Sequence, residues 1–331
     1  MDGGQPRRWS RRAWLGAGLV APVAAAALVG PRVRGAMLGT AALTDGRIAA
    51  PPGGGFPRTL LGPVGDRWTL AGPPRRVVST YLAADEILAS LLPPERMAGV
   101  SVFADDRVVS NVAGFYPRGV ARVRAQVEAI LSLAPDLVCV AGYSDADGLR
   151  LEIGAGLPVL RWSRFATFED VLANVRVLGA AVGADAAAEA LAAGTERELA
   201  ALDARLAGVT PVRALYLDPP DFSAGAGTLI DEMLSRAGAV NVARQARLDG
   251  AGPIPVETAL ALDPDVLVMP AAPGATPPLA MIRAAPLWRE LRAVRSGAVV
   301  NVPAAWTGDV SHHAARAPAT IARALHPSRF G

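Results

Sequence analysis

Residues 127–140 read VEAILSLAPDLVCV, and residues 256–269 read VETALALDPDVLVM. Six of the fourteen positions are identical, at a constant offset of 129. In each copy a helix of about two turns is expected to end before Pro-Asp, because proline disfavours helical geometry in the residue before it. The short apolar run that follows is typical of a strand buried on both faces. The sequence therefore contains the same helix–strand unit twice.

A second pair of similar segments extends this repeat. Residues 85–88 (DEIL) correspond to residues 231–234 (DEML). Each is expected to open a helix after an apolar strand, at Val77 and Val78 in the first half and at 214–217 (ALYL) in the second. Strands that alternate with helices in both halves predict an α/β protein with two Rossmann-like lobes and largely parallel sheets.

Residues 168–208 lie between the two halves and divide at Gly183 and Ala184 into two helical stretches. The second stretch, 185–205, is rich in Ala, Leu, Glu and Arg and contains no proline. An unbroken helix of ~20 residues spans about 30 Å. The sequence therefore predicts that one long helix joins the lobes and restricts their relative motion.

The first 36 residues have the features of an export signal. Arg11 and Arg12 precede an apolar run that extends to about Gly30 and is interrupted by Pro22. A charged start, an apolar middle and small residues are typical of such signals, and paired arginines favour the twin-arginine route. The alternative is a membrane anchor, because the run approaches the ~20 residues that cross a bilayer. We therefore expect a periplasmic protein, which remains anchored if the signal is not cleaved.

The sequence predicts five consecutive segments. They are an export signal (1–36), a tether and N-terminal hairpin (37–74), an N-terminal lobe (75–184), a linking helix (185–209) and a C-terminal lobe (210–331). Residues 37–55 are rich in Gly, Pro and Ala, which is typical of a flexible tether. Cys139 is the single cysteine, so no internal disulfide can form, and we expect it to be buried in a strand.

Composition excludes several classes of protein. All 33 basic residues are arginines, which excludes P-loop NTPases, pyridoxal enzymes and Schiff-base chemistry, since each needs a lysine amine. Residues 1–36 hold six arginines and one acid, so the rest of the chain has 27 basic and 29 acidic residues. Because the net charge of residues 37–331 is close to zero, this part of the chain lacks the excess of basic residues that nucleic-acid binding requires. Motifs of serine hydrolases, dinucleotide sites and zinc sites are incomplete or missing in the sequence. We expect no catalysis, no cofactor and no metal site.

The second copy of the repeat, together with residues 75–79 (RRVVS), 134–138 (APDLV) and 237–242 (AGAVNV), resembles the helical-backbone periplasmic binding proteins. These proteins serve ABC importers of cobalamin, ferric siderophores and haem. The resemblance covers about residues 56–326, and it implies two lobes that face each other across a shallow ligand cleft. It also implies an ABC permease and its ATPase as partners, and a ferric siderophore, cobalamin or haem as ligand. We expect a monomer.

In this family a glutamate on each lobe docks onto arginine pockets of the permease. The positions that look like those glutamates are Glu86 and Glu232. Two carboxylates on separate lobes can pair with arginines of a two-fold symmetric partner. The alternative is that both are exposed acids at helix starts, where the helix dipole favours them.

Loops at the carboxyl ends of parallel strands face the binding crevice of an α/β lobe. In this chain several of these loops carry aromatic residues, although Phe, Trp and Tyr make up only 5% of the sequence. Flat rings suit a corrin, a porphyrin or catechols because they supply a large rigid contact area at low entropic cost. The candidate ligand-binding residues are Tyr81, Tyr116, Tyr143, Arg164, Phe222, Trp306 and His312. Packing is the alternative role for each.

His312 and His313 open the last helix after Ser311, which is expected to cap it. One histidine could ligate a haem iron or the metal of an incomplete chelate. Adjacent helical residues point about 100° apart, so one metal cannot readily bind both. Hydrogen bonding at the helix start is the alternative.

Together these observations predict a non-enzymatic solute receptor that captures a ferric siderophore or a cobalamin-like complex and delivers it to an ABC permease. Arginines and tyrosines among the candidate residues favour ferric complexes, followed by cobalamin and then haem. Two alternatives remain, an exported enzyme acting on a cofactor-like substrate and a ligand-binding envelope sensor.

Overall fold

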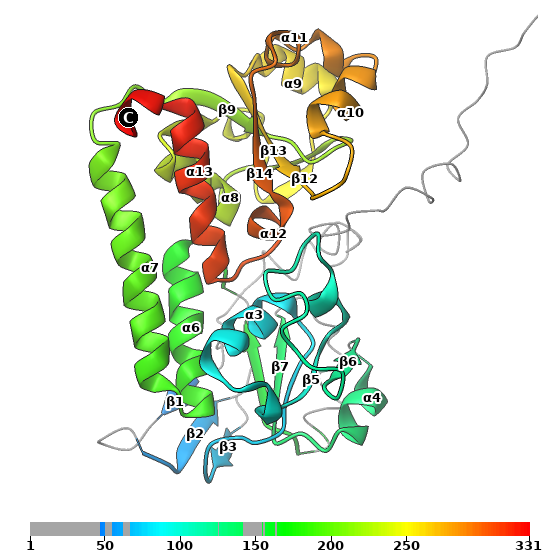
Figure 1. Ribbon diagram of the computed structural model, residues 1–331, viewed down its shortest axis with the longest axis vertical. Helices are drawn as coiled ribbons and strands as arrows, with labels where there is room; N and C mark the ends of the chain where they lie inside the picture. Colours follow the sequence, from blue (N-terminus) through cyan, green and yellow to red (C-terminus); the bar gives the residue numbers. More distant parts are fainter. Residues whose placement is uncertain are drawn as a thin grey trace, which may run out of the picture.

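The computed structural model describes residues 47–49, 55–61, 67–124, 126–141, 154, 156–162 and 164–331. Two α/β lobes lie one above the other in Figure 1, and a long helix runs along one side of both. Each lobe is built on its own parallel sheet, so the predicted fold class is confirmed. The predicted export signal, residues 1–36, lies outside the described residues.

The N lobe contains a five-stranded parallel sheet in the order β6-β5-β4-β7-β8. Its strands are β4 (Val77–Ser79), β5 (Met97–Ser101), β6 (Ala121–Val123), β7 (Leu137–Ala141) and β8 (Val159–Trp162). Its other elements are α3 (Leu82–Leu91), α4 (Val127–Ser132) and the 3-10 turns η1 (Pro94–Arg96) and η2 (Val102–Asp105). All of β7, including Cys139, is buried, as its apolar run predicts.

The C lobe contains a four-stranded parallel sheet in the order β11-β9-β13-β14. Its strands are β9 (Val212–Tyr216), β11 (Ala239–Asn241), β13 (Val266–Ala271) and β14 (Val299–Pro303), and β10 (Phe222–Ala224) pairs separately with β12 (Ala251–Pro253). Its α-helices are α8 (Leu229–Arg236), α9 (Val256–Leu262), α10 (Pro278–Ala284), α11 (Arg292–Ser296), α12 (Ala304–Thr307) and α13 (Arg316–Leu325). Short 3-10 turns are η3 (Val242–Arg244), η4 (Trp288–Glu290), η5 (His312–Ala315) and η6 (Pro327–Arg329).

The repeated sequence unit occupies the same place in both sheets. β7 pairs with β4 in the first lobe, and β13 pairs with β9 in the second. The carboxylate of Asp136 accepts hydrogen bonds from the backbone N–H groups of Arg75 (2.7 Å) and Arg76 (2.9 Å). Asp265 accepts one from the N–H of Arg213 at 3.3 Å. Each Pro-Asp therefore fixes the start of the central strand against its neighbour, and the repeat in sequence is a repeat in structure.

The two lobes share a pair of helices, α6 (Phe168–Val182) and α7 (Asp185–Arg205). The bounds of α7 agree with the helix predicted over 185–205. Its buried positions recur every three or four residues, at Ala188, Ala192, Thr195, Leu199 and Leu202. The two alanines pack in the core of the N lobe, and the two leucines pack in the core of the C lobe. One helix face is thus part of both cores and restricts how far the lobes can move relative to one another.

Two glycines allow this helical pair to form. Gly183 ends α6 with φ of 75°, a left-handed conformation that glycine adopts without strain. A Cβ added at Gly179 would lie 2.2 Å from the Cβ of Ala188. Only the absence of a side chain at Gly179 therefore lets α6 and α7 approach this closely.

The N-terminal strands β1 (Arg47–Ala49), β2 (Arg58–Leu61) and β3 (Arg67–Leu70) form a three-stranded antiparallel sheet. β2 and β3 are the predicted hairpin. β1 lies within the segment expected to be a flexible tether, and its backbone pairing with β2 makes that expectation wrong for these residues. The Arg58 side chain donates to both carboxylate oxygens of Asp185, at 3.0 and 2.8 Å, which attaches this sheet to the first turn of α7.

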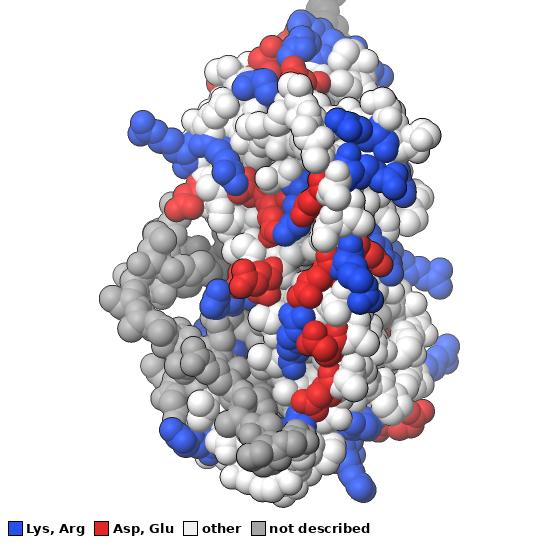
Figure 2. All heavy atoms as spheres, turned by 90° about the vertical axis from the view of Figure 1, so that its left-hand side faces the viewer, with Lys and Arg blue, Asp and Glu red and all other residues white. Residues whose placement is uncertain are grey.

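Figure 2 shows the side of the molecule that carries α6 and α7. Basic and acidic side chains are interspersed on it, and Arg176 forms ion pairs with Glu189 (2.8 Å) and Glu196 (2.9 Å). On this face the charge pattern fits a protein without an extended basic surface for nucleic acid. Within the described ranges, none of the helices has the length and apolar character needed to cross a bilayer.

Candidate ligand-binding cleft

The carboxyl ends of the strands in the two sheets point toward each other (Figure 1). In the N lobe β4 leads into α3, and in the C lobe β9 leads into the loop at Asp218 and β14 leads into α12. Ligands of open α/β sheets bind outside the carboxyl ends of the strands. The space between the lobes is therefore the candidate cleft.

The N-lobe tyrosines predicted as ligand contacts are largely buried. Tyr81 caps the start of α3, is 6% exposed and meets Trp162 edge to face, with ring centroids 5.8 Å apart. Trp162 is the last residue of β8. Tyr116 is also buried, and its hydroxyl donates to the backbone carbonyl of Asp85. A ligand contact by Tyr116 stays a prediction, and in the structure its polar atom is already used inside the lobe.

Other side chains of the N lobe are exposed in the segments that follow β5 and β8. Phe103 in η2 is 44% exposed, and Phe115 in the loop that follows is 43% exposed. The side chain of Arg164 is exposed too and forms an ion pair with Asp170 at 3.0 Å. The predicted Tyr143 lies outside the described residues. Phenylalanines that the sequence analysis did not select therefore supply aromatic surface on this lobe.

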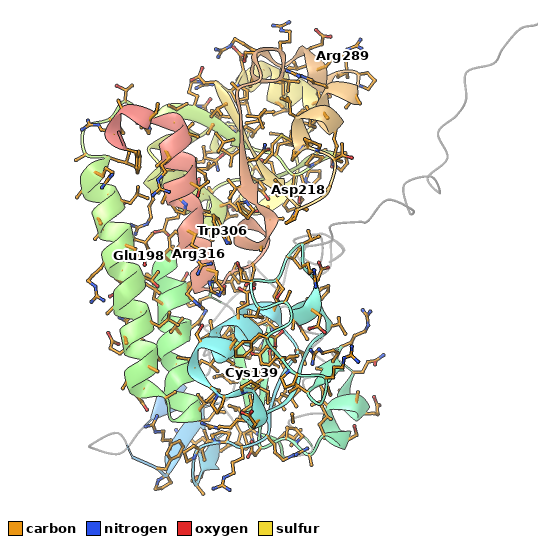
Figure 3. All side chains as sticks on the ribbon, viewed as in Figure 1. Cys139, Glu198, Asp218, Arg289, Trp306 and Arg316 are labelled. Atoms are coloured by element: carbon orange, nitrogen blue, oxygen red, sulfur yellow. The ribbon has the colours of Figure 1, made fainter. Side chains whose placement is uncertain are left out.

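The C-lobe wall includes a carboxyl group near the strand ends. Figure 3 shows Asp218 on the margin of the C lobe that faces the N lobe. Its backbone exchanges hydrogen bonds of 2.8 and 2.9 Å with that of Phe222, which folds residues 218–222 into a tight loop. Burial raises the pKa of Asp218 to about 6. Phe222, a predicted contact, is half-buried against the C-lobe core.

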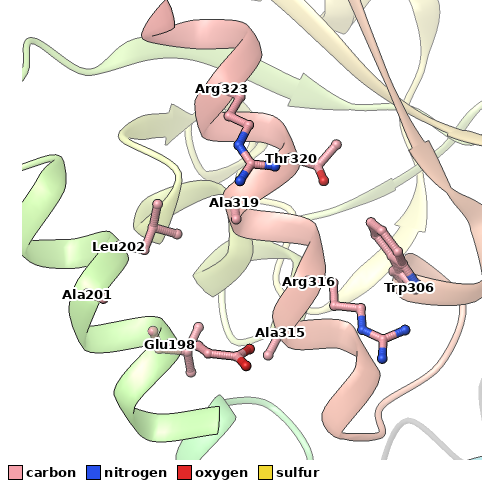
Figure 4. A pocket seen from close by; sticks show the side chains of 10 residues that line it. Glu198, Ala201, Leu202, Trp306, Ala315, Arg316, Ala319, Thr320 and Arg323 are labelled. Carbon is pink, nitrogen blue, oxygen red and sulfur yellow. The ribbon is translucent and has the colours of Figure 1, made fainter. Parts of the chain in front are cut away.

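Trp306 lies in α12, near the other lobe but on the side of α7. It lines a groove of about 410 Å³ between α7 and α13, together with Arg316 and Glu198. In Figure 4 the carboxylate of Glu198 points from α7 toward α13. The structure thus places Trp306 beside the helical pair rather than at the centre of the facing strand ends. Its indole is partly packed against the C-lobe core.

Glu86 is completely buried where the two lobes meet. Its carboxylate accepts hydrogen bonds from the backbone N–H of Asn111 (2.6 Å), from the side-chain amide of Asn111 (3.0 and 3.1 Å) and from the hydroxyl of Ser311 (2.5 Å). The same amide donates to the carbonyl of Ala305 at 2.9 Å. Ser311 and Ala305 belong to the C lobe. Neither the docking role nor the exposed-acid alternative fits Glu86 in this conformation, because its carboxylate joins the lobes.

Glu232 makes a matching connection from the other lobe. This residue of α8 accepts a hydrogen bond from the N–H of Phe168, the first residue of α6, at 2.6 Å. It also pairs with Arg236 one turn later, at 2.7 Å. Its carboxylate thus accepts a hydrogen bond from a backbone N–H at the start of α6, which has no partner within that helix. This placement argues against a docking role for Glu232.

His312 is buried between the lobes and is neutral. It is 8% exposed, its Nε2 lies 3.4 Å from the hydroxyl of Ser90 in α3, and its ring centroid is 4.0 Å from that of His313. Burial lowers the pKa of His312 to about 3. Ser311 accepts from the N–H of His313 at 3.2 Å, which confirms it as the cap. A ligand contact by His312 stays a prediction, and in the structure its ring lies against Ser90 of α3.

Sequence reasoning missed Asn111, Asp309 and Ser311 at this junction. Asp309 is 6% exposed and lies beside Glu86. The signal available in the sequence was the density of polar residues in 307–313 (TGDVSHH) within an otherwise apolar C-terminal region. Local pattern does not reveal that α3 is the partner of this segment. Among the described residues, no cluster of three or more His, Cys, Asp or Glu side chains could hold a metal ion.

Comparison with known proteins assigns the family. The family model described as "Periplasmic binding protein" matches residues 77–305, from β4 of the N lobe to α12 of the C lobe. The chain belongs to this family. The match confirms the family resemblance read from the sequence.

Relatives of this periplasmic binding protein are known from sequence and structure. The chain is 25% identical over 230 residues to YvrC, an uncharacterized ABC transporter substrate-binding lipoprotein of Bacillus subtilis, covering 64% of this chain and 69% of YvrC. It is similar to MolA, the molybdate periplasmic binding protein of Haemophilus influenzae, with a TM-score of 0.72, 21% identity, and coverage of 82% and 92%. It is also similar to the periplasmic haem-binding protein RhuT of Roseiflexus sp. RS-1, with a TM-score of 0.64, 23% identity, and coverage of 77% and 99%.

Proposed function

We propose that this periplasmic binding protein is the solute receptor of an ABC importer, and that it captures a ring-bearing metal complex and delivers it to a permease. The observation that carries this proposal is the pair of repeated lobes whose strand ends face each other, held by helices that belong to both cores. The paired arginines Arg11 and Arg12 support export by the twin-arginine route.

The described cleft residues favour a ligand with flat rings. Phe103 and Phe115 present exposed rings from the N lobe, and exposed aromatic surface is otherwise costly to leave in water. Arg164, which follows β8 and forms an ion pair with Asp170, is an exposed cation on the same lobe. A ferric siderophore with catechol groups or a cobalamin-like complex combines such rings with a metal. Haem and molybdate are the ligands named for RhuT and MolA, so both belong in the test.

Direct titration tests the ligand class. Intrinsic tryptophan fluorescence is followed while a ferric catecholate siderophore, cobalamin, haemin or molybdate is added to the full chain. We expect saturable quenching by one of the ring-bearing complexes and no response to molybdate. Saturation by molybdate alone, or no response to any of the four, would overturn the ligand class.

A matched pair of variants localises the binding. Phe115→Ala removes an exposed ring from the proposed cleft, and stacking of this kind contributes ~1 kcal/mol, or about fivefold in affinity. Leu131→Ala is the control, because Leu131 in α4 is similarly exposed at 39% but does not follow the carboxyl end of a strand. If the wild type and both variants bind the ligand with equal affinity, Phe115 does not contact the ligand.

The repeat also offers a docking pair. Glu128 and Glu257 occupy equivalent positions in α4 and α9, at the offset of 129, and both are exposed. In Figure 1 both helices lie on the side of their sheets away from α7. We therefore propose that these glutamates, rather than Glu86 and Glu232, meet arginines of the permease.

Charge reversal tests the docking pair. Glu128→Arg with Glu257→Arg should abolish uptake in cells while leaving ligand affinity and thermal stability within error, because both side chains are at the surface. Glu95→Arg with Glu198→Arg is the control, because these two glutamates are also exposed but lie outside the repeat unit. Normal uptake by the Glu128/Glu257 variant would refute the assignment.

The proposal is a binding role rather than catalysis or sensing. Among the described acids with raised pKa values, Asp85 lies inside the N lobe and Asp309 lies at the lobe junction. Asp218 lies near the strand ends of the C lobe, and a carboxyl there suits ligand contact. Recovery of the bound complex chemically unchanged after incubation, and loss of its uptake in a deletion strain, would separate a receptor from an enzyme and from a sensor.

A further inference from the structure

The two lobes are joined by a buried polar junction in addition to the helical pair. It consists of Glu86 in α3 and Asn111 in the N lobe, and of the C-lobe segment 305–313, which contains Asp309, Ser311 and His312. Val310, in the middle of this segment, packs against the cores of both lobes. The junction is therefore enclosed by apolar side chains, where electrostatic interactions are stronger than in water.

The bonding of Glu86 leaves its charge without a cation. Three of its hydrogen bonds come from Asn111, and the fourth comes from the hydroxyl of Ser311 across the junction. All of these donors are neutral. A second carboxylate placed beside Glu86 in this environment is strongly disfavoured in its charged form.

Asp309 is that second carboxyl group. It lies within hydrogen-bonding reach of Glu86, and burial together with the charge of Glu86 raises its pKa well above the usual value. Its Oδ2 atom, like the Nδ1 atoms of His312 and His313, is buried without a hydrogen-bond partner among the described residues. In its protonated form Asp309 can donate a hydrogen bond to the carboxylate of Glu86.

Other titratable groups surround this pair. α3 also contributes Asp85, whose pKa burial raises to about 8, and the phenol of Tyr116 bonds to its carbonyl. Burial lowers the pKa values of His312 and His313 of η5, and the Arg316 guanidinium of α13 lowers both further, while the charge of Glu86 opposes this shift for His313. Asp170 of α6 has a cation of its own in Arg164. Glu198 of α7 lines the groove beside η5 together with Arg316. Glu86 is thus the charge that acts most directly on Asp309.

We propose that Asp309 and Glu86 form a proton-dependent latch between the lobes. One proton held between the two carboxyl groups keeps segment 305–313 seated on α3. Loss of that proton places two negative charges side by side, which repels the segment and loosens the lobes around the cleft. The latch acts on lobe geometry and requires no particular ligand.

The sign of the effect follows from the direction of the shift. The folded protein keeps the Asp309 proton at pH values where the unfolded chain, with a pKa near 3.8, has lost it. The latch therefore stabilises the closed arrangement at acid pH, and this contribution is lost as the pH rises through the folded pKa of Asp309.

Distance measurements in the native protein test the latch. Spin labels are placed at Leu131→Cys in α4 and Leu287→Cys near η4, because both side chains are exposed and the native Cys139 is buried. We expect the inter-lobe distance distribution to broaden at least twofold between pH 5 and pH 9. Asp309→Asn, whose amide still donates to Glu86, should keep the narrow distribution at every pH.

Two further variants separate the cause. Glu86→Gln removes the repulsion from the other lobe and should also flatten the pH response, which covers the case that Asp309→Asn does not fold. Asp249→Asn, an exposed C-lobe acid, should behave like the wild type. A wild-type distribution that is constant with pH would overturn the proposal. A pH response that persists in the Asp309→Asn variant or in the Glu86→Gln variant would also overturn the proposal. So would a response that only Asp85→Asn abolishes.

Discussion

Truncation of Glu86 is expected to destabilise the protein severely. The change Glu86→Ala removes an acceptor of four hydrogen bonds from a position with no solvent exposure. The side-chain amide of Asn111 retains the carbonyl of Ala305, but the backbone N–H of Asn111 and the hydroxyl of Ser311 lose their acceptor. Each buried unpaired donor costs about 1–3 kcal/mol.

The two orphaned donors together give a loss of about 4 kcal/mol in the free energy of unfolding. Glu86→Gln keeps one carbonyl oxygen for the Asn111 N–H and should cost about 1–2 kcal/mol. Glu128→Ala, at an exposed glutamate, should stay within about 0.5 kcal/mol of the wild type.

Urea unfolding at pH 7, followed by tryptophan fluorescence and by circular dichroism, measures these differences. Coincident transitions by the two probes would establish that one free energy describes both lobes. If Glu86→Ala unfolds at the same urea concentration as Glu128→Ala, Glu86 is at the surface. The junction between the lobes, and the objection to a docking role for Glu86, would then be refuted.

Three further outcomes are expected. Tyr116→Phe should cost ~1 kcal/mol in unfolding free energy without changing ligand affinity, because its hydroxyl serves the backbone of α3; a drop in affinity at unchanged stability would identify it as a ligand contact. Asp136→Ala should destabilise more than Asp265→Ala in the same urea experiment, since Asp136 holds two backbone N–H groups and Asp265 holds one; the reverse order would contradict the compared roles. An anionic ligand should bind several-fold more tightly as the pH falls through about 6, where Asp218 gains a proton, and Asp218→Asn should remove this dependence in calorimetric titrations. Asp218 also makes the folded state less stable as the pH rises from 3.8 through about 6, because the unfolded chain gives up that proton first.

The backbone plan of the protein follows from local patterns. The long helix was predicted with its observed bounds because a run without proline begins just after Gly183, whose left-handed conformation ends the preceding helix. The Pro-Asp units were placed correctly because each combines a helix stop with a buried apolar run. Such signals act within one or two turns of the residues that carry them.

The roles of individual side chains were predicted less well. Tyr116, Glu86 and His312 have the residue types of a binding or docking site, yet each is buried against a partner distant in the sequence. The hydroxyl of Ser311 reaches Glu86 across 225 positions of the chain. Sequence spacing gives no measure of such a separation, because the helical pair and two sheets intervene.

The sequence by itself determined that two similar α/β lobes follow one another and that a continuous helix joins them. Hydrophobic periodicity and chain-breaking residues are local properties, and they suffice for elements and their order. Only the tertiary structure decided which carboxylates face water and which join the lobes. Burial depends on what packs opposite a side chain, and here that surface comes from the other half of the protein.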